Sequence, residues 1–110
     1  MPTFVTIGYG DRDGYDRTDQ AVRDAAHAHD ADLQRAGAVM GIAGSPVQVR
    51  NHGAEKIAVS QGSFMTSALP IAGFAILEAA DLQEAIEKVS KTPCAVAFGL
   101  VEVWPLKDSP

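Results

Sequence analysis

The sequence predicts an α+β fold built on the ferredoxin-like split βαβ pattern. Strand and helix patterns follow one another in the order β-α-β-β-β-β-α-β. Removing one hairpin from this order leaves the β-α-β-β-α-β unit of that fold. The two expected helices can cover one face of the sheet only. The other face therefore needs a partner sheet.

The first part of the chain predicts a strand, a loop and a long helix. Residues 3–9 are rich in β-branched and aromatic side chains, which is typical of a central strand. A polar, glycine-containing loop follows at 8–16. Thr18 is the expected cap of a helix that runs to about Ala36 and stops at Gly37. One stripe of this helix is expected to face the sheet: Val22, Ala26, His29, Leu33 and Ala36.

The middle of the chain predicts short strands and one long loop. Strands are expected at 38–42, 47–51 and 56–60. Asn51-His52-Gly53 is a good hairpin turn, because Asn and Gly tolerate positive φ. Residues 61–72 are expected to form a loop, and a loop of this length in a small domain is often functional.

The last part predicts a strand, a helix and a strand. The first strand is expected at 73–79. Asp81 and Glu84 form an Asp-x-x-Glu capping box for the helix, and Thr92-Pro93 ends it. The final strand is expected at 95–104. We expect a single domain over residues 1–106 and a loose C-terminal tail at 107–110.

Composition excludes several classes of protein. The 110 residues carry a formal net charge of −5 and no basic patch, which disfavours nucleic acid as a partner. Hydrophobic residues make up 46% of the chain, enough for a packed core, yet no apolar run approaches the length of a membrane span. Cys94 is the single cysteine, so no internal disulfide can form. We expect a cytoplasmic protein without a membrane partner.

Two patterns resemble cofactor or metal sites without meeting their geometry. In Gly8-x-Gly10-x-x-x-Gly14 the third glycine comes one residue late for a dinucleotide loop, and the neighbouring aspartates would repel a pyrophosphate. His27 and His29 are two residues apart on a helix, so they point away from each other and cannot share one metal. We therefore expect no cofactor and no metal site. His29 lies on the apolar stripe and is expected to be a core histidine with one hydrogen bond.

Spaced motifs in the second half identify a family. They are Gln61-Gly62-Ser63-Phe64, Gly73-Phe74, Asp81-Leu82-Gln83-Glu84-Ala85, Pro93 and the run from Gly99 to Pro105. This pattern resembles the YCII-related family, in the branch named for an Asp-Gly-Pro-Phe loop. The resemblance spans residues 47–106 and, more loosely, 3–44. It implies a homodimer in which two sheets face each other as an α+β barrel, with a cleft between the sheet and the 61–72 loop.

The same resemblance implies a catalytic histidine on the first long helix. His27, ahead of Leu33 and Gly37, is the nearest match to the family histidine. The family pairs it with an aspartate before the proline of the last helix-to-strand turn, but here Thr92 precedes Pro93. Without that carboxylate, His27 loses the group that would orient it as a general base. The open alternatives are a catalytic His27 and a surface or interface histidine.

The 61–72 loop also differs from the family pattern. The acid and the lysine expected after Phe64 are absent, which leaves Gly62, the Ser63 hydroxyl and the apolar Phe64 and Met65. Such a loop suits an uncharged or aromatic ligand, with Ser63, Phe64 and Met65 as binding residues. In the alternative interpretation, Phe64 fills a dimer interface.

Glu102 shares a strand face with large apolar side chains. Burial there would raise the pKa of its carboxyl unless a cation lies close to it. Arg50 is the expected cation, since the family pattern has both residues, and we predict Glu102 and Arg50 as further binding residues. Cys94 has no basic neighbour in sequence and is expected to be an inert thiol.

Two functions remain open on this sequence. The first is binding of a small, cyclic or aromatic molecule without catalysis, which the missing charged residues favour. The second, implied by the resemblance, is a cofactor-independent lyase, isomerase or dehydrochlorinase-type enzyme that uses His27.

Overall fold

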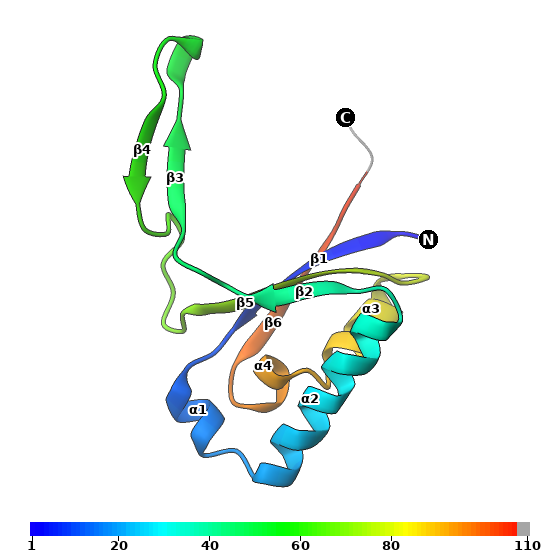
Figure 1. The fold of residues 1–110 in the computed structure, drawn as a ribbon. Helices are drawn as coiled ribbons and strands as arrows, with labels where there is room; N and C mark the ends of the chain where they lie inside the picture. Colours follow the sequence, from blue (N-terminus) through cyan, green and yellow to red (C-terminus); the bar gives the residue numbers. More distant parts are fainter. Residues whose placement is uncertain (108–110) are drawn as a thin grey trace.

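The protein has a mixed α+β fold with a four-stranded antiparallel sheet and a separate two-stranded sheet (Figure 1). The computed structural model describes residues 1–107. The elements are β1 (Thr3–Tyr9), α1 (Arg12–Asp16), α2 (Gln20–Arg35), β2 (Val39–Ile42), β3 (Val47–Arg50), a 3₁₀ turn (His52–Ala54), β4 (Ala58–Gln61), β5 (Ile71–Glu78), α3 (Leu82–Val89), α4 (Pro93–Val96) and β6 (Leu100–Pro105). The four-stranded sheet has the order β2-β5-β1-β6.

Strand β1 lies inside the sheet, as predicted, and pairs antiparallel with both β5 and β6. Its alternate residues Phe4 and Thr6 are buried and face the helices. Phe4 packs with Leu77 of β5 and with Ala85 and Val89 of α3 to form the core. The small residue Ala85 is fully buried, which lets α3 lie close to the sheet.

Helix α3 begins as the capping box predicts. The Asp81 carboxylate accepts a hydrogen bond from the Glu84 backbone N–H at 2.9 Å. The Glu84 side chain reaches back to the backbone N–H of Ala80 at 3.3 Å, one residue earlier than in the standard box. Two of the free N–H groups at the start of the helix region are thereby satisfied.

The loop predicted at 8–16 contains a short helix, α1. Asp11 caps it by accepting a hydrogen bond from the Gly14 backbone N–H at 2.8 Å. The expected cap of the long helix is wrong, because the Thr18 hydroxyl donates to the Gly14 carbonyl at 2.7 Å. Helix α2 begins at Gln20 instead, after Asp19, and Thr18 serves to join α1 to α2.

The last strand is shorter than predicted. Pro93 occupies the first turn of a short helix, α4, where its missing N–H costs no hydrogen bond. Phe98 then adopts a left-handed backbone conformation with φ of 63°, and β6 begins at Leu100. The chain therefore turns at 97–99 and does not continue as a strand from Ala95. Of the predicted C-terminal tail, residues 108–110 lie outside the described residues.

The hairpin formed by β3 and β4 projects away from the four-stranded sheet (Figure 1). Its register places Val49 opposite Val59, so Val47, Val49 and Val59 share one face, and all three are exposed. The opposite face carries Gln48, Arg50 and Ser60. An isolated two-stranded hairpin is marginally stable in water, so this arm needs contacts beyond its own strands.

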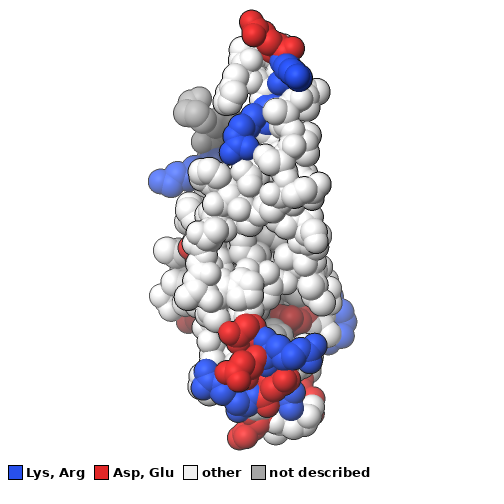
Figure 2. All heavy atoms as spheres, turned by 90° about the vertical axis from the view of Figure 1, so that its left-hand side faces the viewer, with Lys and Arg blue, Asp and Glu red and all other residues white. Residues whose placement is uncertain are grey.

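Helices cover only one face of the four-stranded sheet (Figure 1). The register places large apolar side chains on the other face: Val39, Phe74, Ile76, Leu100 and Trp104. Each of them is about half exposed or more in the single chain. The strands do not close into a barrel within one chain. Charged side chains gather at the end formed by α1 and the start of α2 and at the tip of the hairpin, with a largely uncharged surface between them (Figure 2).

Candidate functional site

A cavity of about 880 Å³ lies between the helix-covered face of the sheet and helices α1, α2 and α4. Its volume is that of a site for a small organic molecule. All four strands of the sheet contribute residues, including Thr6, Gly8, Met40, Ile42, Ala75, Leu77 and Val101. Helix α2 contributes His27, Asp30, Ala31, Leu33 and Gln34. The sheet side of the cavity is therefore mainly apolar, and the helix side carries the ionisable groups.

His27 lines the cavity and contacts Tyr15, which comes from α1. The Tyr15 hydroxyl lies 2.7 Å from Nε2 of His27, and the two rings meet edge to face with centroids 5.9 Å apart. The Arg23 guanidinium lies over the Tyr15 ring, 4.9 Å from its centroid. Nε of Arg23 is buried without a hydrogen-bond partner among the described residues. The ring of Tyr15 is thus in contact with both a cation and an imidazole.

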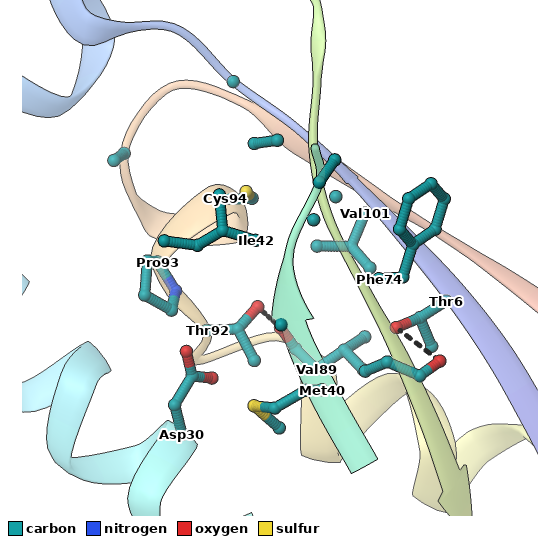
Figure 3. A pocket seen from close by; sticks show the side chains of 18 of the residues that line it. Thr6, Asp30, Met40, Ile42, Phe74, Val89, Thr92, Pro93, Cys94 and Val101 are labelled. Carbon is teal, nitrogen blue, oxygen red and sulfur yellow. Dashed lines mark hydrogen bonds between the residues drawn. The ribbon is translucent and has the colours of Figure 1, made fainter. Parts of the chain in front are cut away.

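Asp30 lies one helical turn after His27 and is partly buried. It reaches from α2 toward Thr92 and Pro93 (Figure 3). Burial raises the pKa of its carboxyl, while the nearby His27 and His29 lower it by a smaller amount. A carboxylate in this position is a polar group in a mainly apolar cavity.

Cys94 lies on the cavity wall against the sheet. A side chain on Gly8 would place its Cβ 2.9 Å from the Cys94 sulfur, so only glycine leaves room for this packing. Burial raises the pKa of the Cys94 thiol, and the negative charge of Asp30 raises it further. The thiol therefore stays protonated at neutral pH, in agreement with the predicted inert cysteine.

His29 makes the single hydrogen bond that the sequence predicts for it. Its Nε2 donates to the backbone carbonyl of Lys88 at 2.6 Å, which joins α2 to the end of α3. This hydrogen bond gives His29 a structural role on the face of α2 that was predicted to face the sheet.

The predicted binding residues of the 61–72 loop do not line this cavity. Ser63 donates to the Met65 carbonyl at 2.8 Å, and Phe64 is 80% exposed. Of this loop region the cavity reaches Ile71 and Ala72. The structure thus separates His27 from Ser63, Phe64 and Met65, and no single site in the described chain contains all four.

The expected pair of Glu102 and Arg50 is wrong for the single chain. Glu102 accepts a hydrogen bond from the Tyr9 hydroxyl at 2.8 Å on the uncovered face of the sheet. This hydrogen bond, burial and the charge of Glu102 raise the pKa of Tyr9. Arg50 lies in the projecting hairpin, where it donates to Ser60 at 3.2 Å and to Gln48 at 2.9 Å. The family pattern indicated both residues but not their distance in space.

Tyr15 and Asp30 are site residues that the sequence alone does not predict. Tyr15 falls in the loop predicted at 8–16, and a loop position gives no direction for a side chain. Asp30 carried a usable signal, because His27 and Asp30 are three residues apart and so share a face of the helix. The family pattern indicates instead the position of Thr92, where the expected aspartate is absent.

Within residues 1–107, no group of three or more His, Cys, Asp or Glu side chains has the arrangement of a metal site. None of the helices in this range has both the length and the apolar character that crossing a membrane requires.

Comparison with protein families gives a match. Residues 3–109 match the YCII-related domain, which is nearly the whole chain. No curated protein matches the sequence. The match agrees with the resemblance seen in the motifs of the second half, and the chain belongs to the YCII-related domain family.

Proposed function

We propose that this protein binds a small, mainly apolar molecule in the cavity beneath α2. The observation that supports this most is the division of the cavity into an apolar sheet side and a polar helix side. A ring or short hydrocarbon part would lie against Met40 and Val101, where its burial is favourable. The ionisable groups of α2 would then fix its orientation.

A matched pair of helix variants tests this proposal. Ala31 lines the cavity, while Ala28 on the same helix is exposed and does not line it. Ala31→Phe should fill part of the cavity, and Ala28→Phe should not. The probe is benzyl alcohol, and its binding is measured by NMR titration. We expect it to shift the amide signals of cavity residues in the wild type and in Ala28→Phe. Binding that persists unchanged in Ala31→Phe, or shifts confined to other surfaces, would contradict the proposal.

The second candidate function is proton transfer by His27. The contact between Tyr15 and His27 favours it, because a hydroxyl at 2.7 Å fixes the orientation of the imidazole ring. In such a reaction a ring nitrogen of neutral His27 takes a proton from a carbon next to a ligand carbonyl, and solvent returns one. In D₂O the α-hydrogens of 2-cyclohexenone would then exchange faster with the wild type than with His27→Gln. Equal exchange rates with the wild type and with His27→Gln would contradict proton transfer by His27 and leave ligand binding as the proposed function.

We further propose a homodimer in which the uncovered sheet faces meet as an α+β barrel. The strand order β2-β5-β1-β6, with helices following β1 and β5, supports a ferredoxin-like topology for each half. The exposed side chains of Phe74, Ile76 and Trp104 support burial against a second copy. The cytoplasmic location stays a prediction from the sequence.

A further inference from the structure

We propose that the ligand of the cavity carries a protonated amine, and that Asp30 accepts its hydrogen bond. This inference rests on the proposed binding function and names the class of ligand: an apolar group joined to an ammonium.

The first support is that Asp30 has no hydrogen-bond or ion-pair partner among the described residues. The other carboxylates on α2 are exposed and have one: Asp24 accepts from Gln20 at 2.9 Å, and Asp32 pairs with Arg35. Asp30 is the more buried of the three and is the one that faces the cavity. A partly buried carboxylate without a partner loses hydration and gains nothing in return.

The second support is that two nearby polar groups are already engaged in other hydrogen bonds. The Thr92 hydroxyl donates to the Val89 carbonyl at 2.7 Å (Figure 3). Nε2 of His27 is engaged by Tyr15. The Cys94 thiol is a weak donor. The hydrogen bond that Asp30 lacks is therefore open to a group that enters the cavity.

The third support is that the charged residues of the cavity wall favour a cationic ligand group at Asp30 over an anionic one. Burial raises the pKa of Asp30 because it disfavours the charged carboxylate, and a cation bound beside the carboxylate would oppose this effect. Arg12, on α1, and Asp11, whose carboxylate already accepts from Gly14, are the other charged residues of the cavity wall. A ligand carboxylate would be repelled by Asp30 and drawn to Arg12, whereas an ammonium gains a charge-assisted hydrogen bond at Asp30.

The test compares three molecules that share one ring: benzylamine, benzyl alcohol and benzoate. Their affinities are measured at neutral pH by NMR titration against the wild type, Asp30→Asn and Asp32→Asn. Asp32→Asn is the matched control, since it removes one carboxylate of the same helix outside the cavity. Ala31→Phe reports whether each molecule binds inside the cavity.

We expect the wild type to bind benzylamine roughly tenfold more tightly than benzyl alcohol, the usual gain from a hydrogen bond to a charged group. This preference should disappear in Asp30→Asn and persist in Asp32→Asn. Equal affinities for the amine and the alcohol in the wild type would overturn the inference and leave the proposed binding function intact. An amine preference that survives in Asp30→Asn would also overturn it. If no compound binds in the cavity, the proposed function and the inference fail together.

Discussion

The Tyr15 hydroxyl lies 2.7 Å from Nε2 of His27 and joins α1 to α2 at the wall of the cavity. The two residues are twelve positions apart in sequence and meet because Thr18 turns the chain between the two helices. This contact gives His27 a partner that the sequence did not reveal. It also makes α1, a helix of only one turn, a part of the candidate site.

Tyr15→Phe should change the environment of His27 with little loss of stability. The ring remains, so the contacts with Arg23 and with the imidazole are kept and only the hydrogen bond is lost. For this exposed bond we expect a loss of about 0.5 kcal/mol in the free energy of unfolding. The ¹⁵N shifts of the His27 ring should move, while those of His29, bonded to Lys88, should not. Equal changes in the ¹⁵N chemical shifts of His27 and His29 would indicate a general change in α2.

Gly8→Ala should destabilise the fold because of one identified contact. The new Cβ would meet the Cys94 sulfur at 2.9 Å, a distance that forces one of the two to move. We expect a cost of about 1–3 kcal/mol, typical of overpacking in a core. The same change in a Cys94→Ala background should cost clearly less. Urea denaturation of the four proteins gives the coupling energy.

Gly41→Ala is the control for this cycle, since a Cβ at Gly41 has no neighbour within 4 Å. It should cost little in either background. A Gly8→Ala cost that is the same with and without the sulfur would show that the backbone of β1, and not Cys94, requires glycine.

His29→Phe should destabilise the protein modestly. The sequence alone predicts tolerance or a gain at this position, because it lies on the buried stripe. The structure adds the 2.6 Å hydrogen bond to Lys88, which the variant loses, so we expect a cost of about 0.5–1.5 kcal/mol in denaturant unfolding. His52→Phe, in the exposed turn of the hairpin, should be close to neutral. A more stable His29→Phe protein would show that the hydrogen bond contributes less than the added apolar contact.

The sequence predicted those parts of the fold whose signals are local. Asp81 and Glu84 placed the start of α3 correctly, because a capping box depends on neighbours within one turn. The interior position of β1 followed from its β-branched residues. Helix α3 ends before Pro93, as the sequence predicts, but Pro93 also begins α4, so the strand expected from Ala95 is wrong and β6 begins after the turn at Phe98.

The site was harder to predict than the fold because its residues meet only in three dimensions. His27 was found through a family pattern, and it does line the cavity. Arg50 and Glu102 came from the same pattern, but one lies in the projecting hairpin and the other on the uncovered sheet face. Sequence spacing fixes neither the direction of the hairpin nor the face of the sheet that holds a cavity.

Asp30→Asn should change how stability depends on pH. Burial raises the pKa of Asp30 above its ordinary value of 3.8, so the folded protein binds this proton more tightly than the unfolded chain. The stability contribution from this group is then present at low pH and is lost as pH rises through the folded pKa. Asparagine does not titrate, so Asp30→Asn should gain stability relative to the wild type as pH rises above about 4. Thermal melting curves across this range measure the difference, and Asp32→Asn should show no such rise.

The proposed dimer should depend on the uncovered sheet face, where Ile76 lies opposite both Val5 and Val39. Ile76 is 48% exposed in the single chain, so Ile76→Lys removes little packing within it. In a symmetric dimer the change places two ammonium groups in an apolar interface, which costs several kcal/mol for each ion. We expect light scattering to give a monomer for Ile76→Lys and a dimer for the wild type. Val22→Lys on α2, 42% exposed and on the helix side, should remain a dimer. A dimeric Ile76→Lys protein, or a monomeric wild type at micromolar concentration, would exclude the sheet-to-sheet barrel and leave the β3–β4 arm as the next interface to test.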